Sequence, residues 1–469
     1  MRRRLSPDLC VIGAGSGGLS VAAGAAQLSA SVVLIERDRM GGDCLNHGCV
    51  PSKSLIAAAA HAHACRDGAL FGITTGAPQV DFTAVRRHVR AVIDGIAPHD
   101  SVERFERLGV TVLRTHGRFV APDEVEAGEI RVRARRVVIA TGSRPAVPPV
   151  PGLNAVPFVT NETVFDLEAL PDRLLVLGGG PIGCELAQAF RRLGAEVDLI
   201  EQGTILPRED PELTAVIRAR LVEEGVRLHE QTQVRRVEPG PSLTMEDANQ
   251  PLRGSHLLVA AGRRPQVDGL GLEVAGIAVD ASGIRVDRRM RTTNPRVFAI
   301  GDVTGGPQFT HAASHAAGIV IKNALFRLPA RARLEGMPRA TYTDPELAAV
   351  GLSESAAAEQ GLRYEVVRWP FLENDRARTE RATEGLVKVI AGRGGRVLGA
   401  AIVGAHAGEL ILPWVLAIER GLRLSALADT IAPYPTRTEA SRRAAGAYYA
   451  PRLFGGTTRR LVRLLAALG

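Results

Sequence analysis

Two cysteines close together near the start of the chain are the side chains best suited to chemistry. Cys44 and Cys49 lie in the segment 41–53, which reads GGDCLNHGCVPSK. Two thiols this close in sequence can form a short-loop disulfide if their Cα atoms come within about 7 Å. A zinc site usually takes two such pairs, and the sequence contains no second pair, so we predict no bound metal. An isolated pair can also be inert, so its function depends on what surrounds it.

Two glycine clusters have the spacing of loops that hold the phosphates of a dinucleotide. They consist of Gly13, Gly15 and Gly18, and of Gly178, Gly180 and Gly183. In such loops the first glycine makes a tight turn, the second lets the backbone approach a pyrophosphate, and the third lets helix and strand pack closely. An acid follows each cluster at the same spacing, Glu36 after the first and Glu201 after the second. We expect each carboxylate to accept hydrogen bonds from ribose hydroxyls.

The elements that must position these residues occur in the same order twice. An apolar run precedes each glycine cluster, and a second apolar run ends at each acid; these runs are residues 9–12, 32–35, 174–177 and 197–200. A helix is predicted after each cluster, the second over 184–193. Later segments repeat as well, since VVIATGSRP at 137–145 is similar to LLVAAGRRP at 257–265. The cysteine pair is an insertion in the first copy, which favours an electron relay beside two bound dinucleotides.

A different pattern follows the second copy. Residues 297–302 form another apolar strand that ends in Gly-Asp. From about Arg339, strand-like runs at 385–390 and 397–403 precede a helix near Glu409. The predicted fold class is therefore α/β, with two tandem Rossmann-like dinucleotide-binding domains and a C-terminal α+β domain.

Composition and charge limit the other classes of function. The 469 residues carry a net charge of +8, but the arginines are interleaved with acids and no nucleic-acid-binding motif occurs. No apolar run reaches the length of about 18 residues that a transmembrane helix needs, and no signal peptide is recognisable. Cys10, Cys65 and Cys184 are predicted to be buried thiols. One close cysteine pair in an otherwise sparse set argues against a secreted disulfide scaffold and favours a reducing compartment. We expect a soluble cytoplasmic protein that binds no nucleic acid.

The last residues form a separate motif. Over 458–468 arginines alternate with Leu, Val and Ala. Two interpretations remain open: a basic amphipathic helix that contacts a membrane or a partner, or a helix that lies on its own protein.

Taken together, these motifs resemble one known family. The chain resembles the FAD-dependent pyridine nucleotide–disulfide oxidoreductases, which include dihydrolipoamide dehydrogenase, glutathione reductase and mercuric reductase. The resemblance covers almost the whole chain and rests on the two glycine clusters, the cysteine segment, ATGSRP, AAGRRP, AIGD at 299–302 and YTDPE at 342–346. It implies an FAD-binding domain at 1–150 with a return segment at 266–335, an NAD(P)H-binding domain at 151–265, and a domain at 336–469 that forms a homodimer.

The resemblance also implies roles for individual residues. Cys49 is expected to lie against the flavin as a charge-transfer thiolate, and Cys44 to attack or ligate the substrate. Lys53 is expected to approach the flavin and to pair with Glu185, and Asp302 to hold the ribityl chain of FAD. His311, on a helix expected over the flavin ring, is a cofactor-binding candidate; it either handles a proton or tunes a thiolate, or is a packed or solvated histidine. The further cofactor-binding positions are Thr141, Gly142 and Gly262.

One position departs from the thiol–disulfide members of the family. Those members carry a His-Pro-Thr-x-x-Glu motif near the end of the last domain, and its histidine handles the proton of a dithiol substrate. Here Tyr434 replaces the histidine, whereas Glu439 is retained, and we include both among the catalytic candidates. Mercuric reductases also have tyrosine there, but they carry a further cysteine pair near the C-terminus, and no cysteine follows Cys184 in this sequence.

The predicted function is that of an FAD-dependent NAD(P)H oxidoreductase. Electrons are expected to pass through a Cys44–Cys49 disulfide to a small acceptor, with a metal ion as the leading class by resemblance. One alternative is a dihydrolipoamide dehydrogenase-type disulfide reductase, and another is a flavin-bearing binding or regulatory module without turnover. NADH is expected in preference to NADPH, because a carboxylate at Glu201 would repel a 2′-phosphate.

Overall fold

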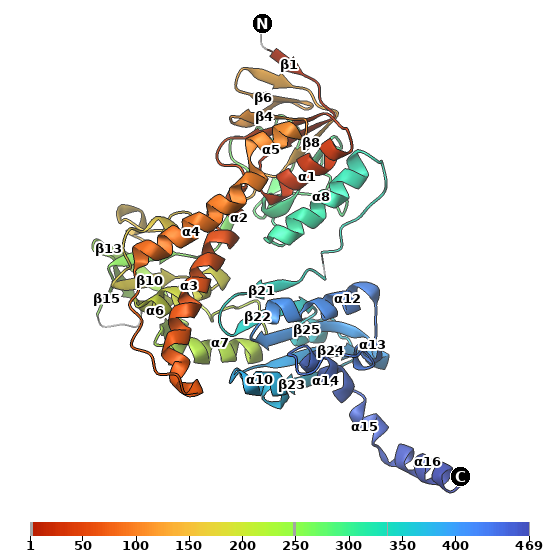
Figure 1. The fold of residues 1–469 in the computed structure, drawn as a ribbon. Coiled ribbons are helices and arrows are strands. Elements are labelled where there is room, and N and C mark those ends of the chain that lie inside the picture. Colours follow the sequence, from red (N-terminus) through yellow and green to blue (C-terminus); the bar gives the residue numbers. More distant parts are fainter. Residues whose placement is uncertain (1–2, 247–249, 335, 469) are drawn as a thin grey trace. The chain divides into compact units, whose positions relative to one another are not determined.

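A computed structural model of the chain describes residues 3–246, 250–334 and 336–468 (Figure 1). The chain forms two compact units, each built from two stretches of sequence. The first unit contains Met1–Gly203 and Gly225–Leu334, and the second contains Thr204–Glu224 and Glu335–Gly469.

A five-stranded parallel sheet forms the centre of the first dinucleotide fold. Its strand order is β20-β8-β2-β3-β4, with β2 at Leu9–Ile12, β3 at Val32–Glu36, β4 at Val110–Arg114, β8 at Arg136–Ile139 and β20 at Val297–Ala299. The strands are apolar because both faces are covered, as is usual for parallel sheets. Helices α1 (Ser16–Gln27) and α8 (Thr310–Ala324) share one hydrophobic cluster with the sheet. The strand β20 thus returns from late in the sequence to pair with β8.

The second dinucleotide fold repeats this arrangement with four parallel strands. Its order is β12-β11-β10-β16, with β10 at Arg173–Leu177, β11 at Glu196–Ile200, β12 at Arg227–His229 and β16 at His256–Val259. The helix α6 (Pro181–Leu193) begins earlier than the predicted 184–193, because Pro181 is suited to the first turn, where its missing N–H needs no partner.

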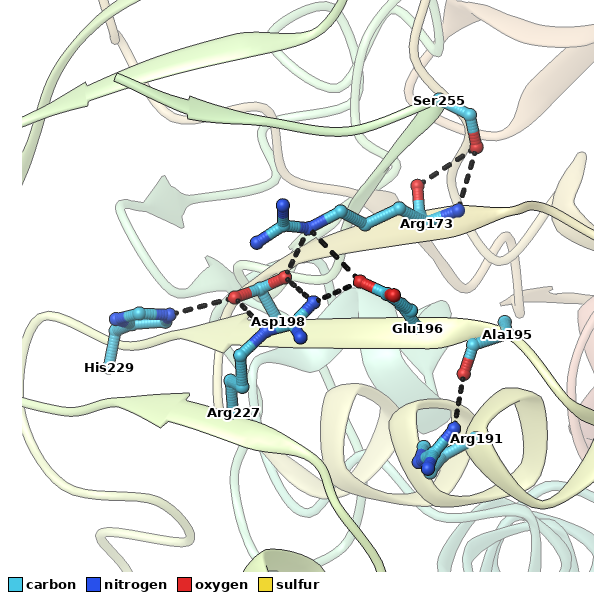
Figure 2. Close-up of polar contacts among 8 residues, drawn as sticks. All are labelled: Arg173, Arg191, Ala195, Glu196, Asp198, Arg227, His229 and Ser255. Carbon is cyan, nitrogen blue, oxygen red and sulfur yellow. Dashed lines mark hydrogen bonds and ion pairs between the residues drawn. The ribbon is translucent and has the colours of Figure 1, made fainter. Parts of the chain in front are cut away.

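A buried carboxylate ties three strands of this second sheet together. Figure 2 shows Asp198 of β11 between Arg173, Arg227 and His229, which lie on the neighbouring strands β10 and β12. Its oxygens accept hydrogen bonds from these side chains at 2.8, 2.9 and 3.0 Å, respectively. Burial alone would raise the pKa of Asp198, but these hydrogen bonds hold it well below its usual range. The network therefore compensates a charge that is fully buried.

The cysteine segment and several small sheets complete the first unit. Between β3 and β4 lie α2 (Gly42–Asn46), α3 (Cys49–Asp67), α4 (Phe82–Ile96) and α5 (Val102–Arg107). The small strands are β1 (Arg3–Leu5), β5 (Gly117–Ala121), β6 (Glu124–Ala127), β7 (Ile130–Val132), β13 (Val234–Glu238), β14 (Ser242–Met245), β15 (Leu252–Arg253), β18 (Val279–Asp280) and β19 (Gly283–Ile284). The repeated segments ATGSRP and AAGRRP pair with each other, since β9 (Ser143–Pro145) and β17 (Arg263–Pro265) form an antiparallel two-stranded sheet.

The second unit is an antiparallel sheet with helices. The strand order is β21-β22-β25-β24-β23, with β21 at Arg339–Thr341, β22 at Glu346–Gly351, β23 at Tyr364–Pro370, β24 at Leu386–Gly392 and β25 at Val397–Gly404. Its helices are α7 (Pro211–Glu223), α9 (Glu354–Glu359), α10 (Asp375–Thr379), α11 (Ala407–Leu410), α12 (Leu412–Arg420), α13 (Leu424–Ala428), α14 (Glu439–Ala447), α15 (Ala450–Leu453) and α16 (Gly456–Ala466). The buried indole of Trp414 on α12 donates to the hydroxyl of Ser441 on α14 at 3.0 Å. The α+β architecture expected for the last domain is confirmed.

The helix α7 belongs to the second unit, although the sequence interpretation placed it within 151–265. Lys388 of β24 is only 4% exposed and forms ion pairs with Asp210, Glu212 and Glu354 at 2.7, 2.9 and 2.7 Å. Burial by itself would lower the pKa of Lys388, but the three carboxylates raise it above its usual value. This cluster holds the start of α7 against the sheet of the second unit.

The structure contradicts one expectation from the sequence and one of the two interpretations of the last helix. Cys65 is exposed near the end of α3, whereas Cys10 and Cys184 are buried as predicted. The helix α16, all of whose residues are described, has no buried residue, so it does not lie on its own chain. Within the described ranges, no helix is both long and apolar enough to cross a membrane.

Candidate redox site

The cysteine segment lies directly against the first glycine loop. Gly41 has a left-handed conformation, and its N–H donates to the carbonyl oxygen of Ala14 at 3.0 Å. A Cβ added at Gly42 would lie 2.6 Å from the Cα of Gly15. Only glycine at both positions allows this approach, so the motif brings the start of α2 to the place where a dinucleotide pyrophosphate is expected.

The two thiols contact each other and have opposite tendencies to ionise. A hydrogen bond from the Cys44 thiol is the main reason that the pKa of Cys49 falls to about 6. The hydroxyl of Thr310, 3.6 Å from the Cys49 sulfur, and the charge of Lys53 act in the same direction, while burial and Asp43 oppose them. The same contact and burial raise the pKa of Cys44 above its usual range. Cys49, at the first position of α3, is thus the thiolate and Cys44 the thiol.

An ion pair connects the cysteine helix to the second dinucleotide fold. The Nζ of Lys53 lies 2.8 Å from a carboxylate oxygen of Glu185, which is buried on α6. Lys53 follows Cys49 by four residues on α3, so both side chains face the same side of the helix. The arrangement places a positive charge beside the thiolate and holds it there.

A polar chain around Arg263 was not predicted from the sequence. The guanidinium of Arg263 lies 3.2 Å from the carboxylate of Asp43, the residue just before Cys44. It also donates to the hydroxyl of Ser143 at 2.8 Å, and that hydroxyl donates to Asp302 at 2.5 Å. Asn161 donates to Asp43 at 3.2 Å. The only signal in the sequence is that all three charged residues lie inside motifs: Asp43 in the cysteine segment, Arg263 in AAGRRP and Asp302 in AIGD.

Asp302 is therefore held at the end of β20 by the same chain. Burial raises the pKa of Asp302, while Ser143 and Arg263, 3.8 Å away, partly counteract this effect. The chain thus connects the expected ribityl-binding carboxylate to the residue beside Cys44.

The first glycine cluster has the geometry of a phosphate cradle, which tests whether the chain fits FAD. A Cβ at Gly13 would lie 2.4 Å from the carbonyl oxygen of Ala140, and one at Gly18 would lie 1.9 Å from that of Gly13. At Gly15 the nearest described atom would be 3.9 Å away, so its backbone is open to a ligand. Gly13 and Gly18 therefore leave no room for a side chain, Gly15 is open, and the residues fit a dinucleotide.

The second cluster repeats these distances. A Cβ at Gly178 would lie 2.5 Å from the carbonyl oxygen of Ala260, and one at Gly183 would lie 1.9 Å from that of Gly178. No described atom outside the immediate chain lies within 4 Å of a Cβ at Gly180. The N-terminus of α6 is thus open in the same way as that of α1 and fits the phosphates of a second dinucleotide.

The acids after the two clusters have a role in holding the loops. Glu36 accepts hydrogen bonds from the N–H groups of Ala14 and Asp38 at 2.6 and 2.8 Å. Glu201 accepts from Gly179 and Gly203 at 2.7 and 2.8 Å. Each carboxylate oxygen retains a second lone pair for a ribose hydroxyl. The two copies therefore agree in the contacts of the acid as well as in its spacing.

The remaining cofactor-binding candidates lie around the β9–β17 pair and α8. The hydroxyl of Thr141 donates to the carbonyl oxygen of Gln266 at 2.7 Å, and Gly142 and Gly262 both have positive φ. His311, exposed on the first turn of α8, stacks on Phe309 with ring centroids 5.2 Å apart.

Tyr434 and Glu439 belong to the second unit, whereas the cysteine pair belongs to the first. Tyr434 is 71% exposed, and its hydroxyl donates to Asp375 at 3.1 Å. This hydrogen bond, with the charge of Asp375, raises the pKa of the phenol. Glu439 pairs with Arg443 at 3.2 Å and with Arg442 at 3.7 Å. The phenol of Tyr434 is therefore not arranged as a base near neutral pH.

Comparisons with known proteins agree with this geometry. A family model described as pyridine nucleotide-disulphide oxidoreductase matches residues 7–317, and the dimerisation domain of that family matches 337–445. A mercuric reductase from Streptomyces lividans is 38% identical, over 93% of this chain and 95% of the relative. A dihydrolipoyl dehydrogenase from Thermus scotoductus is also 38% identical, over 94% of this chain and 97% of the relative.

Solved structures show the same fold. The Cu(II) complex of the HOCl-induced flavoprotein disulfide reductase RclA from Escherichia coli is similar with a TM-score of 0.84 and 29% identity, over 93% of this chain and 98% of that one. LpdA from Mycobacterium tuberculosis has a TM-score of 0.86 and 28% identity, over 97% of this chain and 100% of that one. The dimerisation domain supports a homodimer. The chain therefore belongs to the pyridine nucleotide–disulphide oxidoreductase family, as an enzyme that uses FAD and a nicotinamide nucleotide.

Proposed function

We propose that the enzyme uses NADH to reduce a thiophilic metal ion at Cys44 and Cys49. The observation that carries this proposal is Tyr434, whose phenol is hydrogen-bonded to Asp375 and has a raised pKa. A dithiol substrate needs a base that takes up and releases a proton near neutral pH. A soft metal ion needs only thiolate ligands, which the cysteine pair supplies.

The relatives support a metal acceptor. Several are named mercuric reductases, at 32–38% identity, and one similar solved structure is named a Cu(II) complex. No cysteine follows Cys184 in this sequence, so Cys44 and Cys49 are its candidate metal ligands. Cys65 is exposed on the far end of α3 and offers a control thiol.

The residues of the chain have distinct parts in this proposal. FAD, when bound, relays two electrons from the nicotinamide to the sulfur pair. Cys49 supplies one thiolate, and Cys44 releases its proton when a divalent metal ion binds both sulfurs. Lys53, held by Glu185, keeps a positive charge beside Cys49, and Asp302 anchors the ribityl chain. Overall, NADH and a divalent ion such as Hg(II) give NAD⁺, one proton and the metal in its zero-valent state, so two electrons are transferred.

Turnover with a panel of acceptors tests the proposal. The protein is reduced with NADH without oxygen and then mixed with Hg(II), Cu(II), lipoamide, glutathione disulfide or a quinone. We expect fast oxidation of NADH with a metal ion and little with lipoamide. Cys44→Ala should abolish metal reduction but leave hydride transfer to the flavin, and Cys65→Ala should change neither rate. Metal reduction that survives Cys44→Ala would refute the proposal.

A dihydrolipoamide dehydrogenase-type reductase is the second candidate, favoured by the Thermus scotoductus relative. The replacement of histidine by Tyr434 separates the two functions. On the metal proposal, Tyr434→His should increase lipoamide turnover, and Tyr434→Phe should change neither metal reduction nor hydride transfer, because the metal ion needs only thiolate ligands. Tyr364→Phe, on β23, is the matched control. Lipoamide turnover by the unmodified protein as fast as flavin reduction would establish the second candidate instead.

A further inference from the structure

The last helix, α16, presents an unburied apolar face. Leu461, Leu464 and Leu465 are between 53% and 61% exposed. Their spacing places them on one side of a helix, with Arg459 and Arg463 on the opposite side. Leu453 and Phe454, just before α16, are exposed as well.

The charge of this region is entirely positive. No Asp or Glu follows Glu439 in the sequence, whereas arginines continue to Arg463. Arg459, Arg460 and Arg463 are exposed, and no described residue forms an ion pair with them. The match to the dimerisation domain ends at residue 445, so α16 lies outside the matched domain.

The helix is attached to the second unit by a defined joint. Arg452 of α15 forms an ion pair with Glu365 of β23 at 2.5 Å, and its guanidinium lies 4.1 Å from the ring centroid of Tyr448. Thr458 donates a hydrogen bond to the carbonyl oxygen of Arg452 at 3.1 Å. Figure 1 shows α16 following α15 beyond the sheet and helices of its own unit. The joint therefore presents the helix away from the unit's core.

We propose that α16 binds the surface of an anionic lipid bilayer. A helix with leucines on one face and arginines on the other lies in the plane of the lipid–water boundary, with its apolar face among the acyl chains. Its uniform positive charge complements anionic headgroups. A second copy of α16 is a poor occupant, because pairing two such helices would bring like charges together. The helix is too short to span the bilayer, so the contact is peripheral.

Sedimentation of the full-length enzyme with lipid vesicles tests this proposal. Vesicles of phosphatidylcholine with one-third phosphatidylglycerol should bind the protein, and vesicles of phosphatidylcholine alone should bind it much less. Each arginine near an anionic surface contributes about five-fold to binding, so Arg459→Gln/Arg463→Gln should weaken it about 25-fold. Leu461→Ser/Leu465→Ser should weaken binding at least as much, and raised salt should weaken it in the unmodified protein.

Matched controls separate lipid binding from general effects of charge and folding. Arg87→Gln/Arg236→Gln removes the same charge from exposed sites on α4 and β13, and Leu28→Ser removes an exposed leucine after α1. These variants should bind vesicles as the unmodified protein does, and all variants should retain NADH oxidation. Absence of binding to anionic vesicles, or equal losses in the controls, would overturn the proposal. A change of oligomeric state in Leu461→Ser/Leu465→Ser, without a change in lipid binding, would assign the face to a second copy instead.

Discussion

At the scale of single residues, the chemistry of the site depends on the different ionisation of two neighbouring thiols. Cys49 has a pKa of about 6, mainly because the Cys44 thiol donates a hydrogen bond to it. The pKa lies below the usual value of a thiol, so the thiolate is present above about pH 6 and is lost as the pH falls through that value.

This difference predicts a pH-dependent absorption band. In the two-electron-reduced enzyme, a thiolate at Cys49 against oxidised flavin should give a long-wavelength charge-transfer band that fades as the pH falls through about 6. Absorption spectra recorded over a pH series measure the midpoint. Cys44→Ala should move the midpoint to higher pH, because the main stabilising hydrogen bond is lost. A band that persists in Cys49→Ser would show that another group is the donor.

The Asp43–Arg263 ion pair predicts opposite effects of two neutralising substitutions. Asp43→Asn removes a negative charge near Cys49 and should lower the pKa of that thiol. Arg263→Gln leaves Asp43 uncompensated and should raise the pKa, in each case by less than about one unit. Alkylation rates of Cys49 as a function of pH measure both shifts. Asp123→Asn is the control, because Asp123 pairs with Arg133 and Arg296 and not with Arg263. Shifts of the same sign in both variants would contradict this role.

At the scale of elements, the strand–glycine–helix unit is built in the same way twice, and the acid of the second copy predicts which nucleotide it binds. Glu201 closes the second loop through Gly179 and Gly203. A carboxylate at this place accepts from a free 2′-hydroxyl and repels a 2′-phosphate. We predict that kcat/KM favours NADH over NADPH by about 1–3 kcal/mol. Steady-state kinetics with the two nucleotides measure the ratio, and an equal or higher value with NADPH would exclude this role for Glu201.

The buried network of the second sheet makes a prediction for stability. Asp198→Asn removes the charge that Arg173, Arg227 and His229 share, and should lower the free energy of unfolding by about 3 kcal/mol. Because the pKa of Asp198 is held low, this contribution is present at neutral pH and is lost only as the pH falls through that low value. Urea unfolding measures both effects. Glu196→Gln, on the same strand but exposed, should have little effect. Similar losses in both variants would contradict the central role of Asp198.

At the scale of the whole molecule, the second unit is assembled from two distant stretches of chain. Residues 204–224 bring the start of α7 to Lys388, and Leu213, Ile217 and Leu221 of α7 are buried. A fragment that begins at residue 336 lacks Asp210 and Glu212, two of the three carboxylates that pair with Lys388. It should therefore unfold at a much lower urea concentration than the same fragment joined to residues 204–224. Circular dichroism during urea titration compares them. Equal midpoints would show that α7 is dispensable for this unit.

Much of the fold follows from local patterns in the sequence. The two parallel sheets, the order of strand, glycine loop and helix, and the use of each glycine were predictable, because each depends on residues within one short stretch. The cysteine pair and the Lys53–Glu185 partners were identified only through their motifs and the family they resemble. The roles of the individual site residues in catalysis and in cofactor binding stay predictions.

By itself the sequence determined the two dinucleotide folds, the dithiol segment and the replacement of histidine by Tyr434, because periodicity, glycine spacing and residue identity are local properties. Only the tertiary structure decided that Arg263 pairs with Asp43, that Lys388 draws α7 into the second unit, that Cys65 is exposed and that α16 leaves its leucines unburied. These outcomes depend on contacts between residues far apart in the chain, or on the lack of such contacts among the described residues. Periodicity predicts which face of an element is apolar, but the tertiary packing determines what covers that face.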